Sequence, residues 1–154
     1  MVPAGGYSSQ NLRTTYSLGQ QRMVSGRVTV GRGSFYEGTR TELSYNGRLG
    51  IVPQFAFEPS LSFNRVELPF GEFSATLVNS RFIFTPTPRT SVSSLIQYNA
   101  SAHTVSSSVR LRWEYVAGSE IFAVYSDGRN TLDSASQGLL NRSIAIKATR
   151  LVRF

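Results

Sequence analysis

The chain has 154 residues, of which 16% are charged and 12% aromatic, and it contains no cysteine. These values exclude a disordered chain, which would lack aromatic residues, and they exclude zinc sites built on thiolates. The net charge of +7 comes almost wholly from arginines spaced singly along the sequence. This spacing differs from the clustered basic residues of nucleic-acid-binding proteins, so no nucleic-acid partner is expected.

Alternation of apolar and polar residues predicts an all-β chain. Most of the predicted strands have nine to thirteen residues. Strands of soluble proteins have about 5–6 residues, whereas a membrane-spanning strand needs about 9–11. In chain order, the nine segments cover roughly residues 9–18, 23–34, 39–51, 54–65, 73–85, 90–99, 105–116, 120–128 and 142–154.

The alternation is clearest in "FAFEPSLSF", residues 55–63, and in "SVRLRWEY", residues 108–115. In the first segment, Phe55, Phe57 and Phe63 share one face with Leu61, and Glu58 shares the other with serines. A helix would not place aromatic residues at every second position with polar residues filling the gaps.

The predicted connections alternate in length along the chain. Short ones, such as "VPQ" and "VAGSE", alternate with longer ones, such as "RGSFYEGTR", "VELPFGE", "NASAHT" and "DGRNTLDSASQGLLN". Bacterial outer-membrane barrels have short periplasmic turns and longer extracellular loops. We therefore predict an antiparallel up-and-down transmembrane β-barrel, with residues 1–154 forming a single outer-membrane domain.

The strand number needs an adjustment, because bacterial single-chain barrels usually have an even number of strands. Omitting the N-terminal segment leaves eight strands, which we favour, although ten are possible. A further possibility is that the chain is the C-terminal part of a larger, porin-like barrel. Alternation alone does not decide which face meets water, so a soluble ligand-binding β-barrel is the alternative from another class.

Large aromatic residues near the predicted strand ends are expected at the membrane–water interfaces, where aromatic belts lie. These residues are Phe35, Tyr36, Phe82, Phe84, Tyr98, Trp113, Tyr115 and Tyr125.

The polar face of the predicted barrel mixes arginine with glutamate, which can pair across neighbouring strands inside a lumen. Two roles follow: a paired, hydrated plug, or a channel that prefers anions. The predicted lumen-facing residues are Arg13, Arg27, Glu42, Arg48, Glu58, Arg81, Arg110, Arg112, Glu114 and Lys147.

Catalytic and cofactor motifs are missing from the sequence. His103 is the only histidine and lies in the predicted loop "NASAHT", where a polar loop residue is expected. No nucleophile, base and orienting acid are marked out, and "GRGSFYEG" lacks the spacing of a phosphate-binding loop. We expect no enzyme activity, no metal and no cofactor, although an outer-membrane hydrolase is a third hypothesis.

Three segments resemble a known group: "RGSFYEG", "LIQYNASAHTVSSSVRLRWEYVAGSEIFAVYSDGRNT" and "NRSIAIKATRLVRF". They look like the C-terminal barrel region of a bacterial outer-membrane family of unknown function, whose members carry an N-terminal carbohydrate-binding-like domain before the barrel. The resemblance implies a Gram-negative outer-membrane location, contact with the lipid bilayer and lipopolysaccharide, and no catalytic residues. For such a barrel we expect a structural, anchoring or narrow-pore role, or alternatively a place in a larger outer-membrane transport pore.

The terminal Phe154 looks like the C-terminal aromatic signal that the barrel-assembly machinery reads. Val152, Ile146 and Ile144 match the apolar positions of that signal, whereas Arg150 departs from them. The resemblance therefore implies that Phe154 marks the chain for insertion and that the assembly machinery is a partner.

Overall fold

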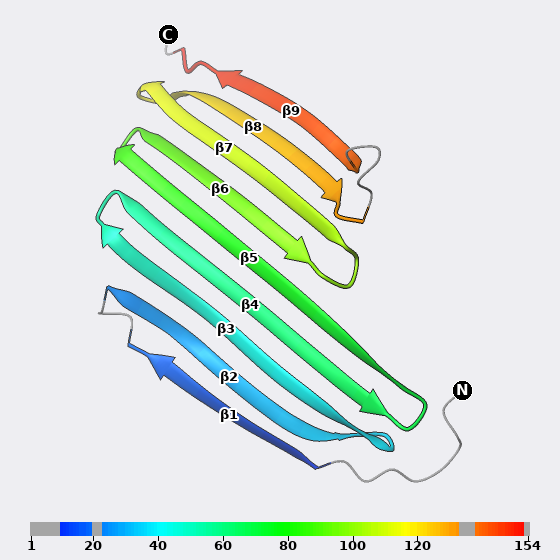
Figure 1. Ribbon diagram of the computed structural model, residues 1–154. Helices are drawn as coiled ribbons and strands as arrows, with labels where there is room; N and C mark the ends of the chain where they lie inside the picture. The colour runs from blue at the N-terminus through cyan, green and yellow to red at the C-terminus, as the bar shows by residue number, and fades with distance from the viewer. Residues whose placement is uncertain (1–9, 20–22, 133–137, 153–154) are drawn as a thin grey trace.

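The computed structural model describes residues 10–19, 23–132 and 138–152, which form one antiparallel sheet without a helix (Figure 1). Each strand pairs with the next in chain order, so the sheet is a meander. The strands are β1 (Asn11–Leu18), β2 (Val24–Phe35), β3 (Gly38–Val52), β4 (Phe55–Leu68), β5 (Gly71–Thr87), β6 (Thr90–Asn99), β7 (Thr104–Val116), β8 (Ser119–Asn130) and β9 (Leu139–Thr149). Within the described ranges, no helix is long and apolar enough to cross a membrane.

Five strands, β3, β4, β5, β7 and β8, are longer than the sequence predicts, and several predicted loops are shorter. Only two residues separate β2 from β3, and only two separate β4 from β5. The first of these turns is tight because Phe35 still pairs with Gly38, and Tyr36 between them adopts a left-handed φ of 55°. The sequence predicts long connections after β2, β4, β6 and β8, but only those between β6 and β7 and between β8 and β9 are longer than two residues.

The two ends of the sheet are named here by their connections. The end that carries the β2–β3, β4–β5, β6–β7 and β8–β9 connections is called the loop end. The opposite end carries the β1–β2, β3–β4, β5–β6 and β7–β8 connections and is called the turn end (Figure 1).

The sheet is not closed into a barrel, and the favoured number of eight strands is wrong. β1 pairs with β2 along its whole length, from Asn11 opposite Gly33 to Leu18 opposite Gly26, so all nine segments are strands. In a nine-stranded meander the first and last strands run in the same direction. An antiparallel ladder therefore cannot join β1 to β9, and the two edges lie on opposite sides of the sheet (Figure 1).

The sheet has one apolar and one polar face. Paired residues of an antiparallel ladder point to the same side, and side chains alternate along each strand, so the register assigns every strand residue to a face. The apolar face carries, among others, Tyr16, Val28, Leu43, Tyr45, Phe57, Leu61, Phe63, Val78, Phe82, Ile96, Tyr98, Val109, Leu111, Trp113, Tyr125, Ile144 and Ile146.

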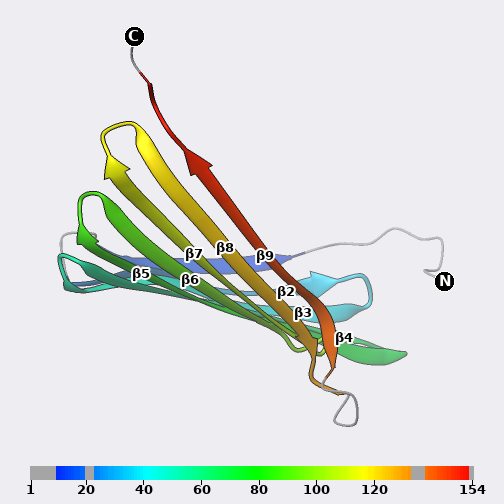
Figure 2. The same cartoon turned by 90° about the horizontal axis from the view of Figure 1, so that it is seen from above.

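In residues 10–19, 23–132 and 138–152, no second layer covers the apolar face. A compact monomer of 17.0 kDa exposes about 7,700 Å², whereas this chain exposes 11381 Å². Even on the interior strand β7, Val109 is 40% exposed and Trp113 is 48% exposed. Among the described residues, Ala56 and Val66 are the only buried hydrophobic ones. The sheet is also strongly twisted, with β6–β9 rising away from β1–β4 (Figure 2).

The predicted last strand ends earlier than the sequence suggests. β9 stops at Thr149, and the chain then turns aside so that the Leu151 N–H donates to Ser119 Oγ at 3.0 Å. Ser119 is only 2% exposed, so this hydrogen bond fixes the chain against the β7–β8 turn. Phe154, the predicted assembly signal, lies outside the described residues.

Candidate functional site

The polar face brings together all ten residues that the sequence predicts for a lumen. The register places Arg13, Arg27, Glu42, Arg48, Glu58, Arg81, Arg110, Arg112, Glu114 and Lys147 on this face. Arg40 and Glu120 lie there as well, and the same alternation would have found them. Their position beside a lumen stays a prediction.

A row of polar side chains crosses the middle of this face, one from each strand. The row consists of Ser17, Arg27, Asn46, Ser60, Asn79, Gln97, Ser106, Gly128 and Asn141, with only glycine interrupting it. Ser60 Oγ donates to Asn46 Oδ1 at 2.7 Å. Gln97 Nε2 donates to Asn79 Oδ1 at 3.3 Å. Sequence reasoning missed this row, because neutral polar residues look alike whether they lie in a row or are scattered.

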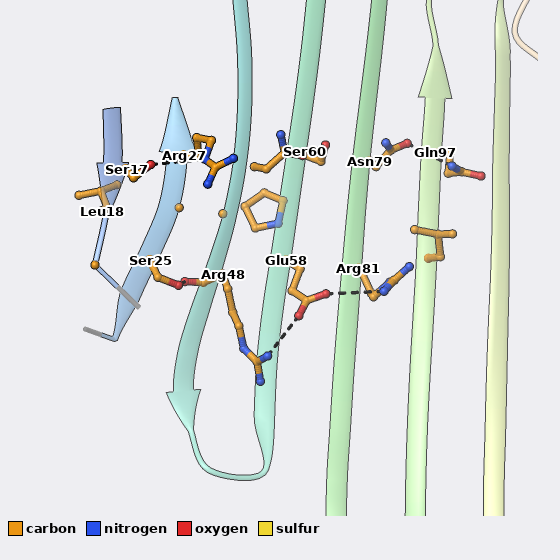
Figure 3. A pocket seen from close by; sticks show the side chains of 16 residues that line it. Ser17, Leu18, Ser25, Arg27, Arg48, Glu58, Ser60, Asn79, Arg81 and Gln97 are labelled. Atoms are coloured by element: carbon orange, nitrogen blue, oxygen red, sulfur yellow. Dashed lines mark hydrogen bonds and ion pairs between the residues drawn. The ribbon is translucent and has the colours of Figure 1, made fainter. Parts of the chain in front are cut away.

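The polar face is hollowed where this row crosses β1–β6. The hollow has a volume of about 1010 Å³, and its lining includes Arg27, Arg48, Glu58 and Arg81 (Figure 3). Two smaller hollows, of about 360 and 230 Å³, are also lined mainly by polar-face residues. The polar face is therefore the concave one in these places.

Glu58 lies between two arginines at the turn end of the hollow (Figure 3). Arg48 Nη1 is 3.6 Å from Glu58 Oε1, and Arg81 Nη1 is 3.8 Å from Glu58 Oε2. Neither contact is short enough for a strong charge-assisted hydrogen bond, which is about 2.7–2.9 Å long. The third arginine of the hollow, Arg27, donates from Nε to the neutral Ser17 Oγ at 3.3 Å.

Most ion pairs outside this hollow are tighter; the exception is Arg40, whose Nη2 lies 3.9 Å from Glu42 Oε2 and donates instead to Asn64 Oδ1 at 3.0 Å. Arg13 Nη2 lies 2.7 Å from Glu42 Oε2, and Arg112 Nε lies 2.8 Å from Glu120 Oε2. Gly31 stands between Arg13 and Glu42 in the same cross-strand row, so its missing side chain lets the guanidinium reach across β2. The hollow therefore differs from its surroundings in holding arginines that are only loosely paired.

Charged residues of the apolar face are confined to its loop end. Each of them lies within three residues of the loop end of its strand, and the rest of the face in the described strands is uncharged. These residues, called the charged rim below, are Arg32, Arg65, Glu67, Glu72, Asp127, Arg129 and Arg142.

Most of the charged rim is hydrogen-bonded within itself. Arg65 Nη2 donates to Glu72 Oε2 at 2.7 Å. Asp127 accepts from both Arg129 Nε, at 2.7 Å, and Arg142 Nε, at 3.0 Å.

On the apolar face of β4, the charge-free part runs from Phe55 to Phe63, which is nine residues and about the length of a membrane-spanning strand.

The predicted interface aromatics are divided between the ends of the sheet. Phe82, Phe84, Trp113 and Tyr115 lie at the turn end, and Tyr98 and Tyr125 lie nearer the loop end. The rings of Phe82 and Phe57 are stacked with their centroids 4.7 Å apart. The rings of Trp113 and Tyr115 meet edge to face with their centroids 6.2 Å apart.

Phe35 and Tyr36 differ from the other predicted interface aromatics. Alternation along β2 puts Phe35 on the same face as Arg27, because the strand continues without a break into the turn. Tyr36 lies in that turn itself and packs edge-on against Phe35 at 4.8 Å.

The described residues contain no group of three or more histidine, cysteine, aspartate or glutamate side chains that could hold a metal ion. His103 has a backbone role, because it adopts a left-handed φ of 50° in the β6–β7 turn. Its carbonyl oxygen accepts hydrogen bonds from both the N–H and the Oγ1 of Thr131. These hydrogen bonds involve only the backbone of His103 and tie the β6–β7 turn to the segment that follows β8.

Comparisons with protein-family models, with curated proteins and with solved structures gave no match to this chain. The resemblance to an outer-membrane family therefore stays a prediction.

Proposed function

We propose that this sheet is one wall of an outer-membrane β-barrel, with its apolar face against lipid and its polar face lining a water-filled interior. The observation that carries this proposal is that the hollowed face of the sheet is polar and the opposite face is apolar, which is the reverse of a soluble barrel. The hollowed face holds Arg27, Arg48, Glu58 and Arg81, and the other face exposes aliphatic and aromatic side chains. A soluble ligand-binding barrel has the opposite arrangement, with an apolar cavity and a polar exterior.

The pattern of charge on the apolar face also favours lipid as its cover. A second protein layer would tolerate charged groups anywhere that they could pair, whereas hydrocarbon excludes them from a band of defined height. The charged rim begins just after Phe63, where the nine-residue stretch of β4 from Phe55 ends, whose apolar-face side chains are all uncharged. Polar groups of lipid, including the phosphates of lipopolysaccharide, suit the arginines of this rim.

The two edge strands favour the interpretation that these nine strands are one wall of a larger barrel and not a complete barrel. β1 and β9 run in the same direction and have no neighbour on their outer sides within the described residues. Open sheet edges in lipid cost several kcal/mol for each unpaired backbone group. An odd number of additional antiparallel strands between β9 and β1 would satisfy both edges and make the total even. We therefore favour a larger transport pore over a self-contained narrow barrel.

Insertion into lipid vesicles tests this proposal. The chain, unfolded in urea, is diluted into phosphatidylcholine vesicles, into detergent and into plain buffer, and β-structure is followed by circular dichroism. We expect β-structure to form with vesicles and detergent, and the protein to float with the vesicles in a density gradient. A monomer that folds in plain buffer and does not float would contradict the proposal and support the soluble alternative.

A further inference from the structure

We propose that the hollow of the polar face is a binding site for small oxyanions, meaning solutes that carry a carboxylate or phosphate group, with Arg27, Arg48 and Arg81 as the recognition residues. The site's role in passage rests on the proposed function, because only a pore would bring solutes to it. Binding itself requires only the folded polar face.

Within the part of the chain that the structure describes, each of the three arginines has N–H donors that no protein group uses. Arg48 and Arg81 approach Glu58 only at 3.6 and 3.8 Å, beyond the range of a strong charge-assisted hydrogen bond. Elsewhere in the described strands, Arg13, Arg65 and Arg112 each donate to a carboxylate at 2.7–2.8 Å. A guanidinium presents five N–H donors in a planar fork that matches the geometry of carboxylate and phosphate groups.

The neutral side chains of the hollow also present donors. The Oδ1 atom of Asn46 accepts from Ser60, and the Oδ1 atom of Asn79 accepts from Gln97. Because each amide oxygen already accepts a hydrogen bond, the amide N–H groups of Asn46 and Asn79 can donate to a ligand. Three arginines, one carboxylate and these amides make a lining that favours acceptors with negative charge.

The spacing of the strands sets the size of the ligand. Arg48 and Arg81 are two strands apart, on β3 and β5 with Glu58 on β4 between them. Neighbouring strands are about 4.8 Å apart, so the two Cα positions are separated by roughly 10 Å. This span suits a small solute with one or two anionic groups. A metal cation would meet three guanidinium groups and is not favoured by Coulomb's law.

A titration of the full chain folded in detergent at an ionic strength of about 0.1 M, where the Debye length is about 10 Å, tests this proposal without requiring a pore. The probes are inorganic phosphate, succinate, glucose and choline, followed by calorimetry or by side-chain NMR signals of arginine. We expect saturable binding of phosphate and succinate and none of glucose or choline, and the ratio of the two affinities shows which oxyanion the site prefers. Equal binding of glucose, or no saturable binding of either anion, would overturn the proposal.

Two variants with equal loss of charge separate a site from a general electrostatic effect. The hollow variant carries Arg27→Gln, Arg48→Gln and Arg81→Gln, and the control variant carries Arg13→Gln, Arg65→Gln and Arg112→Gln. We expect anion binding to weaken about tenfold in the hollow variant, because charge-assisted hydrogen bonds are lost. The control variant should stay within about twofold, since exposed charges at a distance are screened. Equal weakening in both would contradict the proposal.

Glu58→Gln is expected to strengthen anion binding and not to weaken it. It therefore tests the site even if the triple variants misfold. Removing the carboxylate that competes for Arg48 and Arg81 should tighten anion binding several-fold. A purely structural role for Glu58 would leave binding unchanged or weaken it, and either result would overturn the proposal. Vesicle insertion of the same variants is scored separately, so a failure of the pore and a failure of the anion site give different results.

Discussion

Arg13 on β1 and Glu42 on β3 form an ion pair of 2.7 Å across the intervening strand β2. The contact passes over Gly31, which is opposite both residues in the register. A Cβ atom at Gly31 would lie 3.6 Å from the Cβ atom of Glu42, which is an ordinary contact, so the row tolerates a methyl group but not a long side chain.

This relationship predicts that Gly31→Leu loosens β1, whereas Gly31→Ala does not. The leucine side chain would occupy the path of the Arg13 guanidinium and separate it from Glu42. Because exposed ion pairs contribute at most about 1 kcal/mol, the overall free energy of unfolding should change by no more than that. Backbone amide hydrogen exchange of β1 is the sensitive measurement. Faster exchange in Gly31→Ala than in Gly31→Leu would contradict the prediction.

A pair of substitutions on adjacent residues of β4 compares the two faces. Leu61 lies on the apolar face and Ser62 on the polar face. Arginine at a mid-membrane, lipid-facing position of a barrel costs about 2–4 kcal/mol, so Leu61→Arg should lower the folding free energy in vesicles by that amount. Ser62→Arg should cost less than about 1 kcal/mol, because its side chain would meet water. Equal costs, measured by urea titration, would contradict the assignment of the faces.

The hydrogen bond between the Leu151 N–H and Ser119 Oγ predicts a local effect at the end of the chain. Ser119→Ala removes the acceptor, and a lost neutral hydrogen bond costs about 0.5–1.5 kcal/mol. We expect faster hydrogen exchange at Leu151, with little change in β3–β5. Ser119→Thr keeps the hydroxyl and is the control. Unchanged protection of Leu151 in Ser119→Ala would show that other contacts, such as Leu151 against Gly118, hold this segment.

The direction of the edge strands predicts that the nine strands do not close on themselves. The chain contains no cysteine, so pairs of introduced cysteines report on proximity without background. Thr15→Cys on β1, combined in turn with cysteine at Ser143, Ala145 or Lys147 on β9, should give no disulfide within one chain. Such a bond needs Cα atoms within about 7 Å. Efficient intramolecular cross-linking on a non-reducing gel would show a closed parallel seam and contradict the proposed larger wall.

The sequence predicts the faces of this sheet better than its edges. In residues 55–63, apolar and polar residues alternate because the two sides of the strand meet different surroundings. This pattern repeats every two residues, so a short segment of sequence is enough to detect it. The predicted segments 23–34 and 39–51 agree with β2 and β3 to within one residue at each end, but the connection "RGSFYEGTR" between them resembles a loop because it contains glycines and polar residues. In the structure, Phe35 pairs with Gly38 and the ladder runs through most of this segment.

Closure and the pairing of charges depend on which strands are neighbours, and this information is absent from the alternation of a single strand. The approach of Arg13 to Glu42 requires the register of three strands and the glycine between them. The loose pairing of Arg48 and Arg81 with Glu58 depends on side-chain distances that a pattern of residue types does not contain. The sequence therefore proposed the right residues for the polar face without distinguishing tight pairs from loose ones.

Accessibility measured along β4 tests the central claim most directly. Single cysteines at each position from 55 to 65 are spin-labelled in the vesicle-inserted protein, and collisions with oxygen, which partitions into lipid, are compared with those of a water-soluble nickel complex. We predict oxygen-accessible labels at the odd positions 55–63, nickel-accessible labels at the even positions, and nickel access at the rim position of Arg65. Nickel access at the odd positions 55–63, or the absence of a period of two, would contradict a lipid-facing apolar surface.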